Sequence, residues 1–490
     1  MDCANRLYRA EQVRELDRLA IERHGIAGYE LMNRAGRAAF QTLRARWPEA
    51  RRITVCCGGG NNGGDGYVIA RLAREAGMDV QLIALKNPDE LAGDAARAAA
   101  DWREPAGVLA DPADSLTGQV IVDALLGTGL DRPPTGPYAR LIERINESPR
   151  PVLAVDVPSG LDADTGMPLQ PAVRADLTVT FIGNKRGLYT GQAGRWCGQR
   201  LYFDLDTPEA IHETVRADAW LLDAASLPAW LPPRAPDTHK GDLGHVLVIG
   251  GDAGMAGAPV LAGRAALRAG SGLVSLATRA GHAAAALAVQ AELMCHAVET
   301  LEALDVLMES ADVLGLGPGL GRSDWSRAVW RRALGADLPL VLDADGLNLL
   351  ADADPPWPLP RAILTPHPGE AARLLDCSAA EVQSDRFAAV RALAERHGAV
   401  VVLKGHGTLV AEPSGQVAVC PFGNPAMASA GMGDALTGII ASLVGQGLEP
   451  FEAACCGVLV HALAGDRAAA GRRQILATDL IDQLADVLPA

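Results

Sequence analysis

The sequence has few aromatic residues and a shortage of basic charge. Of its 490 residues, 4% are Phe, Trp or Tyr, and 44 Lys and Arg stand against 59 Asp and Glu, for a net charge of −15. This acidity argues against nucleic acid or an anionic membrane as a partner. A phosphate-bearing ligand would have to be held locally, by backbone amides and metal ions.

A membrane span, an export signal and a disulfide framework are also missing. The longest uncharged run, Pro413 to Gly433, contains Pro421, Pro425 and several glycines, so it lacks the roughly 20 apolar residues of a span. The start, MDCANRLYRAEQVRELDRL, is charged and has no apolar core of an export signal. The nine cysteines lack C-x-x-C spacing and are interpreted as small buried residues. We therefore expect a soluble cytoplasmic protein.

Short apolar runs alternate with alanine-rich helical stretches along the chain. The runs typical of strands are 53–57, 80–85, 120–125, 152–157, 177–182 and 201–205, then 245–249, 273–277, 313–316, 338–342, 362–364 and 400–403. Continuous apolar strands separated by helices indicate parallel sheets covered on both faces. The pattern predicts a fold of two doubly wound α/β domains.

A change of composition marks the boundary between the two domains. Four prolines, at 228, 232, 233 and 236, cluster in a stretch that cannot form a continuous helix or a central strand. The predicted organisation is a domain over 1–215, a proline-rich linker over 216–236 and a second domain over 237–490.

Three loops at predicted strand ends carry polar residues in the first half. Gly58 to Gly66 reads GGGNNGGDG, between a strand and a helix expected to begin near Tyr67, and would let a backbone approach a pyrophosphate. Asp123 and Ser159 follow two further strands. The side chains of Asn62, Asp123 and Ser159 would converge as oxygen donors for a hard cation. A single strand-end aspartate is more often a helix cap, but three such loops in one sheet favour a site.

The second half also concentrates polar residues at strand ends. His367 lies between two prolines, and Lys404 opens the turn KGHGT. Asp434 follows a glycine turn that opens an uncharged helix, where free N–H groups and the helix dipole can stabilise a transferring phosphoryl group. The alternatives are a structural histidine, a solvated lysine and a capping aspartate. A carboxylate at this position can also take the proton from an attacking hydroxyl.

The motifs GGNNGGDG, VDALLGTGL and DVPSGLDADTG resemble the epimerase half of the bifunctional NAD(P)H-hydrate repair enzymes, over about Leu7 to Tyr202. The resemblance implies a Rossmann-like domain with potassium ligands Asn62, Asp123 and Ser159. It implies hydrate contacts at Asn61, Asn62, Gly63, Gly64, Asp65, Gly127, Thr128, Gly129, Leu130, Asp131, Arg132, Pro133 and Asp156. Asp156, at a strand end beside the substrate loop, is our hypothesis for the proton-transfer residue.

The motifs TPHPGE, KGHGT and GMGD resemble the dehydratase half of the same family, over about Asp237 to Asp486. That half is ribokinase-like, with Asp434 as the catalytic residue. The resemblance implies hydrate contacts at Ala258, Gly319, His367 and Asp434. It implies adenine-nucleotide contacts at Lys404, Gly405, His406, Gly407, Thr408 and Gly433. The chain departs from many relatives at Ala426 and Ala430, where they have glycine, and near Met255, where they have tyrosine.

The resemblance implies that the two halves catalyse successive reactions of the same substrates. The first half would interconvert the 6R and 6S hydrates of NADH and NADPH, and the second would dehydrate the 6S form with ADP and Mg²⁺, giving AMP and phosphate. NADHX and NADPHX would be the small-molecule partners, and we expect a homo-oligomer that binds neither nucleic acid nor membrane. The alternatives are a vitamin-alcohol kinase fused to a nucleotide-binding domain, a dinucleotide dehydrogenase and a nonenzymatic scaffold.

Overall fold

The protein is described by a computed structural model that covers residues 3–104, 107–353 and 359–489. The chain divides into two compact units, Met1–Trp220 and Leu221–Ala490, and each is described by itself. The division falls within the predicted linker over 216–236. That segment contains the short strand β10 (Ala219–Leu221) and the one-turn helix α7 (Leu227–Trp230).

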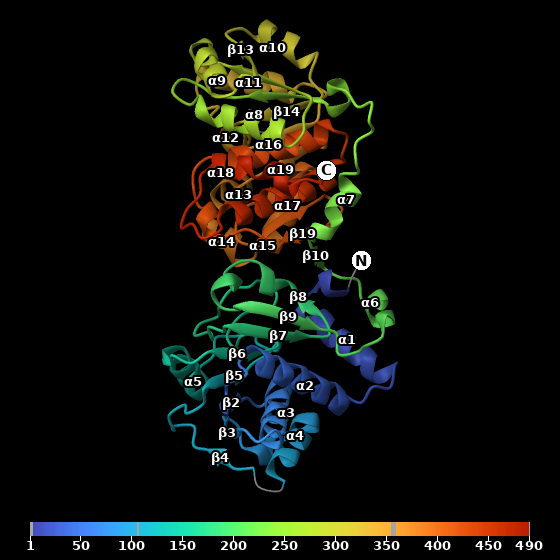
Figure 1. Cartoon of the computed structure of the whole chain (residues 1–490), viewed down its shortest axis with the longest axis vertical. Helices are drawn as coiled ribbons and strands as arrows, with labels where there is room; N and C mark the ends of the chain where they lie inside the picture. Colours follow the sequence, from blue (N-terminus) through green and yellow to red (C-terminus); the bar gives the residue numbers. More distant parts are fainter. Residues whose placement is uncertain (1–2, 105–106, 354–358, 490) are drawn as a thin grey trace. The chain divides into compact units, whose positions relative to one another are not determined.

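The N-terminal unit is a parallel sheet with helices on both faces (Figure 1). Its strands are β1 (Arg6–Tyr8), β2 (Arg52–Cys57), β3 (Asp79–Ala84), β4 (Leu109–Ala110), β5 (Val120–Ala124), β6 (Val152–Val155), β7 (Leu177–Phe181), β8 (Asn184–Lys185) and β9 (Gln199–Phe203). Its helices are α1 (Ala10–Glu22), α2 (Gly28–Arg46), α3 (Asn61–Glu75), α4 (Gly93–Arg103), α5 (Gly136–Glu147) and α6 (Glu209–Thr214).

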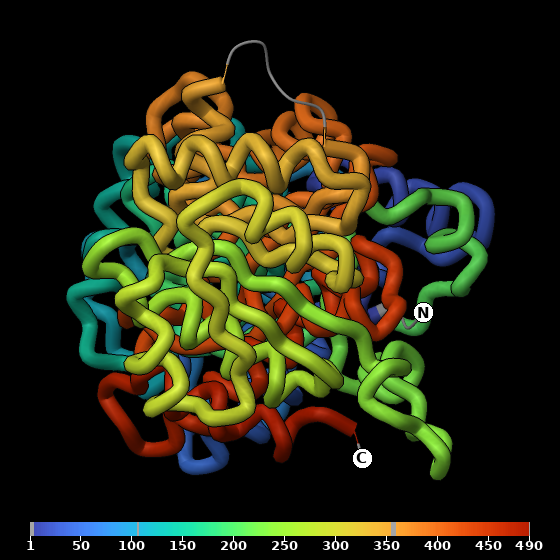
Figure 2. Tube along the Cα trace, turned by 90° about the horizontal axis from the view of Figure 1, so that it is seen from above, coloured from blue at the N-terminus to red at the C-terminus, as the bar shows by residue number. Residues whose placement is uncertain are grey.

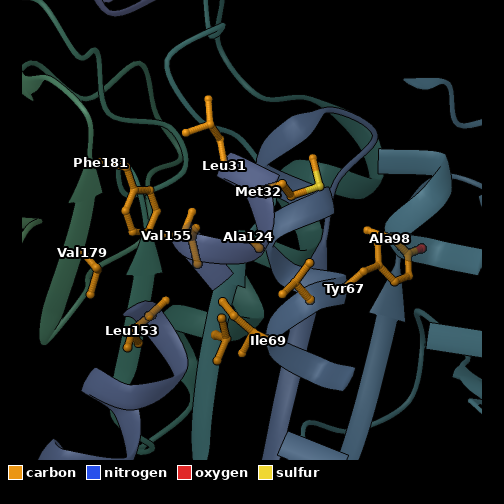
Figure 3. Packing of buried hydrophobic residues seen from close by; sticks show 14 of the residues in the cluster. Leu31, Met32, Tyr67, Ile69, Ala98, Ala124, Leu153, Val155, Val179 and Phe181 are labelled. Atoms are coloured by element: carbon orange, nitrogen blue, oxygen red, sulfur yellow. The ribbon is translucent and has the colours of Figure 1, made fainter. Parts of the chain in front are cut away.

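The order of this seven-stranded sheet, β4-β3-β2-β5-β6-β7-β9, reverses direction between β2 and β5. Alternate residues of β2 face opposite cores, as the two-residue period of a strand requires. Val55 and Cys57 pack with α2, α3 and α4, whereas Cys56 packs with α5. Figure 3 shows the first of these cores, in which Tyr67 and Ile69 of α3 lie over the sheet. The apolar strand runs were therefore a sound guide to this sheet.

One helix begins earlier than predicted. Helix α3 starts at Asn61 rather than near Tyr67, so the last six of the nine residues of the glycine-rich run lie in its first two turns. Glycine has a low helix propensity, but tertiary packing overrides it here. A Cβ on Gly63 would lie 2.2 Å from the Gly58 carbonyl oxygen, and one on Gly66 would lie 2.7 Å from Cys57 Sγ. These two glycines allow α3 to pack against the end of β2.

The C-terminal unit repeats the α/β alternation. Its strands are β11 (His245–Ile249), β12 (Leu273–Thr278), β13 (Met294–Ala297), β14 (Val313–Leu316), β15 (Leu340–Leu342), β16 (Ala362–Leu364), β17 (Val400–Leu403), β18 (Thr408–Ala411) and β19 (Val417–Cys420). Its other helices are α8 (Gly257–Arg268), α9 (Ala283–Val289), α10 (Leu301–Met308), α11 (Asp324–Leu334), α12 (Ala344–Ala351), α13 (Pro368–Leu375), α14 (Ala379–Ser384), α15 (Arg386–His397), α16 (Met432–Gly445), α17 (Pro450–Ala468), α18 (Ala477–Asp482) and α19 (Leu484–Val487).

Strands of this unit follow the order β13-β12-β11-β14-β15-β16-β17-β18-β19, which reverses between β11 and β14. The strands from β11 to β17 pair in parallel, and β18 and β19 add an antiparallel edge. Helices α11 and α12, yellow to orange in Figure 2, lie side by side. Helix α16 packs between α8, α17 and the sheet, which explains its nearly uncharged sequence. The edge strand β13 was not predicted, because its residues are only half-buried.

We predict that Gly438→Ala destabilises the C-terminal unit by about 3 kcal/mol and lowers its Tm by roughly 6–12 °C. A Cβ at this position of α16 would lie 1.9 Å from the backbone oxygen of Ala262 in α8, where neither backbone can move aside. The matched control is Gly257→Ala, also in a helix, where a Cβ meets nothing within 4 Å. Differential scanning calorimetry of the full chain compares them, and equal Tm values would contradict the close α8–α16 packing.

Candidate active sites

The first site lies where the N-terminal sheet reverses, between the carboxyl ends of β2 and β5. Ligands of open α/β sheets bind at such switch points. Helix α3 follows β2 after three glycines, and its N-cap, Gly60, has no side chain to cap the first amides. Because the first amides of a helix have no partner within the helix, they are available to an anion.

A cavity of about 650 Å³ opens at this switch point. Among the predicted hydrate contacts, the following line this cavity: Asn61, Asn62, Asp65, Gly127, Thr128, Gly129, Leu130 and Asp156. Gly63 and Gly64 are buried in α3. The remaining three predicted contacts, Asp131, Arg132 and Pro133, are exposed and lie outside this lining. The volume is sufficient for a substantial part of a dinucleotide.

Two of the predicted cation ligands form a buried pair behind the cavity. Ser159 Oγ donates to Asp123 Oδ1 at 2.6 Å, and the Ser159 amide donates to Asp123 Oδ2 at 2.8 Å. Both side chains are fully buried. Burial raises the pKa of Asp123 to about 6, although the hydrogen bonds from Ser159 and Leu125 partly oppose it. A cation would stabilise the ionised carboxylate.

The third predicted ligand, Asn62, has an unsatisfied side chain. Its buried amide oxygen and nitrogen have no hydrogen-bond partner among the residues described. A Cβ on Gly127 would lie 3.3 Å from Asn62 Cγ, so the amide lies against the loop after β5. Because buried polar atoms are nearly always satisfied, this amide indicates a missing ligand. An amide oxygen, a carboxylate and a hydroxyl are suitable donors for a hard cation.

A group of carboxylates surrounds one lysine on the cavity wall. Lys185 Nζ is ion-paired with Asp156 Oδ1, and Asp17 and Asp65 also line the cavity. Burial raises the pKa of Asp17 to about 6 and raises that of Asp65 well above its usual value, and the Asp156 charge adds to both shifts. Asp17 and Asp65 therefore keep their protons to a higher pH than free aspartates do.

The second site is centred on the start of α16. Its N-cap, Gly431, adopts φ 89° and has no capping side chain, and Asp434 in the first turn is the only charged residue of the helix. Lys404, directly after β17, lies beside this turn: a Cβ on Gly433 would be 3.2 Å from Lys404 Nζ. An uncapped helix start beside an ammonium group is suited to bind an anion.

Asp343, directly after β15, connects these elements. Its Oδ1 accepts a hydrogen bond from Lys404 Nζ at 2.7 Å, and its Oδ2 accepts one from Thr437 Oγ1 of α16 at 2.9 Å. Burial favours a higher pKa for Asp343, but the Lys404 ammonium and these hydrogen bonds keep the pKa below its usual value. Burial raises the pKa of Asp434 to about 6, with a further increase from the Asp343 charge. Asp434 is thus a carboxyl group that titrates near neutral pH.

His367 and Glu370 form another part of this site. His367 is the N-cap of α13, and its Nδ1 accepts hydrogen bonds from the amides of Gly369 and Glu370 at 3.0 and 3.3 Å. Burial and the nearby Lys404 charge lower the pKa of His367, which keeps the ring neutral. Glu370 Oε2 lies 3.9 Å from Lys404 Nζ, and burial raises the pKa of Glu370 to about 7.

Ala258 and Gly319 meet at the point where the second sheet reverses. Ala258 lies in the first turn of α8, after β11, and Gly319 lies in the loop after β14. A Cβ on Gly319 would be 3.2 Å from Ala258 Cβ and 3.1 Å from Met255 Cβ. The same loop also contacts the first turn of α12, because the Gly321 amide donates a hydrogen bond to Asp345 Oδ2 at 2.8 Å. The predicted hydrate contacts therefore lie at one sheet edge.

Lys404 to Thr408 forms the tight turn between antiparallel strands β17 and β18. Gly405 and His406 are exposed, whereas Gly407 is buried. Beneath the turn, the buried Arg386 guanidinium donates to the carbonyl oxygens of Leu403 and Lys404 at 3.0 and 3.3 Å. These bonds fix the turn from which Lys404 projects.

Comparison with known families matches both units. Residues 28–187 match the family described as YjeF-related protein N-terminus, and residues 246–486 match the family described as NAD(P)H-hydrate dehydratase. The bifunctional NAD(P)H-hydrate repair enzyme Nnr of Coxiella burnetii is 51% identical over 98% of both chains. The enzyme of the same name from Escherichia coli is 44% identical over 98% of this chain and 93% of that protein.

The chain belongs to the bifunctional NAD(P)H-hydrate repair enzymes. Among solved structures, a ribokinase-like superfamily protein from Enterococcus faecalis is 27% identical, with a TM-score of 0.52, over 55% of this chain and 94% of that protein. The predicted family and the predicted α/β class, Rossmann-like then ribokinase-like, are confirmed. Within the described part of the chain, no helix is both long and apolar enough to cross a bilayer.

Several residues of these repair-enzyme sites were not predicted from the sequence. Lys185 and Asp17 line the first cavity, and Asp343, Glu370 and Arg386 organise the second site. Asp343 follows an apolar strand run directly, and Asp123 also lies at the end of such a run, so the sequence contained enough information to find Asp343. Lys185 and Asp17 lie in segments without a motif, and only the fold brings them to Asp156.

Proposed function

We propose that this chain epimerises the 6R and 6S hydrates of NADH and NADPH in its N-terminal unit and dehydrates the 6S form with ADP in its C-terminal unit. The observation that supports this most directly is the 51% identity to a bifunctional NAD(P)H-hydrate repair enzyme along nearly the whole chain. The two switch-point sites agree with it, because each combines anion-binding amides with titrating carboxyl groups. We expect the enzyme to act in the cytoplasm as a homo-oligomer.

Epimerisation at C6 requires the hydroxyl group to leave and water to return on the other face of the ring. The ring nitrogen lone pair expels the hydroxyl group, which takes a proton to leave as water, and the returning water gives a proton back. We assign Asp156 as the proton acceptor and Asp65, whose pKa burial raises well above its usual value, as the proton donor on the same wall. The loop residues 127–133 and the start of α3 would hold the dinucleotide.

Potassium would bind Asn62, Asp123 and Ser159. The unsatisfied Asn62 amide and the buried Asp123 carboxylate match this ion, which prefers oxygen donors. When bound, the ion would supply the positive charge that keeps Asp123 ionised and would tie the start of α3 to the loop after β5.

In the dehydratase site, Asp434 would take the proton from the 6S hydroxyl group as its oxygen attacks the β-phosphate of ADP. The attack breaks the bond between the β-phosphorus and the bridging oxygen of ADP and releases AMP. The ring nitrogen lone pair then expels phosphate from C6, and the resulting iminium ion loses a proton from C5 to give NAD(P)H. Lys404 to Thr408 and Gly433 would hold the nucleotide, and Ala258, Gly319 and His367 would hold the hydrate. Mg²⁺ would bind mainly through the diphosphate oxygens and offset their charge.

Asp434→Asn should abolish dehydration while nucleotide binding stays within about threefold, because the amide cannot accept the hydroxyl proton. In the wild type, the base must be ionised. kcat/KM for dehydration should therefore fall about tenfold per pH unit below the Asp434 pKa of about 6 and level off above it. The assay follows NADH absorbance with AMP and phosphate release from ADP. Retained turnover would reject Asp434 as the base.

Asp156→Asn should lower the epimerisation rate by at least about 100-fold and leave dehydration of the 6S hydrate unchanged. Epimerisation is followed by chromatography of the two hydrates with ADP omitted. The second activity of the same chain controls for folding and concentration. Interconversion at the wild-type rate would show that another group transfers the proton.

Replacing K⁺ by choline should slow epimerisation and lower the thermal stability of the N-terminal unit, by about 1–3 kcal/mol relative to saturating K⁺. Asp123→Asn should remove both effects. The stabilisation should weaken as the pH falls towards 6, because burial raises the pKa of Asp123 to about 6 and protonation removes the charged ligand. Thermal shift measured without substrate gives a readout independent of activity, and a K⁺ response that survives in Asp123→Asn would place the ion elsewhere.

A further inference from the structure

Lys185 lies inside the N-terminal unit, in contact with the group that we assign as the epimerase base. It is the second residue of the two-residue strand β8, which pairs in parallel with β1, the first strand along the chain. Its side chain is 1% exposed, although it reaches the wall of the 650 Å³ cavity. Burying an ammonium group is unfavourable unless it is paired. The contacts of Lys185 are therefore informative.

Both contacts of the Lys185 ammonium restrict the position of one carboxylate. Lys185 Nζ is ion-paired with Asp156 Oδ1 and donates a hydrogen bond to the Phe181 carbonyl oxygen at 2.9 Å. Because this carbonyl belongs to β7, the ammonium cannot follow Asp156 if that side chain turns. Lys185 thus links the carboxylate to the end of strand β7.

The backbone and one hydroxyl group complete the support of Asp156. The residue adopts φ 68° directly after β6, a left-handed conformation that is uncommon outside glycine, and its amide donates to the Val179 carbonyl oxygen at 2.7 Å. Thr180 Oγ1 donates to Oδ1 at 3.3 Å. Both side-chain donors therefore use Oδ1, and among the described residues Oδ2 has no hydrogen-bond partner. Oδ2 is the oxygen left for a substrate.

We propose that Lys185 is a positioning residue of the epimerase: by holding Asp156 Oδ1, it fixes the carboxylate so that Oδ2 is presented to the C6 hydroxyl group or water of the hydrate. This inference rests on the proposed function of the same site. Lys185 does not contact the reacting atoms in this scheme. Its charge also compensates a wall that contains three carboxyl groups, Asp17, Asp65 and Asp156, and no other lysine or arginine side chain reaches Asp156 among the residues described.

The test compares Lys185→Met with a neighbouring control in the full-length chain. Lys185→Met should lower kcat for epimerisation by roughly 100-fold while KM changes less than about threefold, because the substrate-binding loop and α3 are untouched. Arg186→Met is the matched control, since Arg186 is also buried and ion-paired, with Asp218 at 2.7 Å, but does not line the cavity. It should leave kcat within about threefold. Dehydration of the 6S hydrate normalises the protein concentration in both variants, and a thermal melt checks the fold of the N-terminal unit.

A second variant separates positioning from a general loss of structure. In Lys185→Ala, ethylammonium can reach the vacated position from the cavity and should raise kcat at least about tenfold, with saturation, while neutral propanol should not. Wild-type kcat in Lys185→Met, a loss expressed only in KM, or an equal loss in Arg186→Met would overturn the proposal. If the wild-type chain shows no epimerisation, the proposed function itself is wrong. This outcome is different from a failure of the Lys185 proposal alone, in which the wild-type chain is active.

Discussion

In each unit, a lysine is paired with an aspartate that directly follows a buried parallel strand. Asp156 follows β6 and pairs with Lys185, and Asp343 follows β15 and pairs with Lys404. The second pair joins the ends of β15 and β17, which β16 separates, whereas the first joins the end of β6 to β8, which lies outside the seven-stranded sheet. Removing one partner from such a buried pair would leave an uncompensated charge, so the geometry of both sites depends on it.

The two pairs differ in which partner faces the ligand. Lys185 is enclosed, and its aspartate reaches the cavity, so this pair presents a carboxylate for proton transfer. Lys404 is one-fifth exposed and lies beside the uncapped start of α16, whereas Asp343 is buried. In this second pair, the Lys404 ammonium group is therefore the partner placed to attract an anion at the start of α16. The strongly acidic chain can therefore bind phosphates, because the attraction is local and does not depend on net charge.

The sequence predicted the parts of the fold and sites that local pattern determines. Apolar runs located β11, β14, β16 and β17 to the residue, and a glycine motif indicated the helix start that carries Asp434. The start of α3 was misplaced because its glycines are required by close packing against Gly58 and Cys57 at the end of β2, which the sequence pattern does not show. Lys185 and Asp17 were missed for the same reason: their importance comes from what the fold places beside them.

His367 and Asp343 both occupy helix N-cap positions, but their side chains do different things there. His367 does cap α13, through Nδ1, and so its Nε2 remains for Glu370 or a ligand. Asp343 occupies the N-cap of α12 but makes no side-chain cap; its two oxygens bind Lys404 and Thr437 instead. A cap at such a position contributes about 1 kcal/mol. Helix α12 forgoes that contribution, and the following residue, Ala344, adopts φ 48°. The local arrangement is thus better suited to holding the anion-binding lysine than to stabilising its own helix.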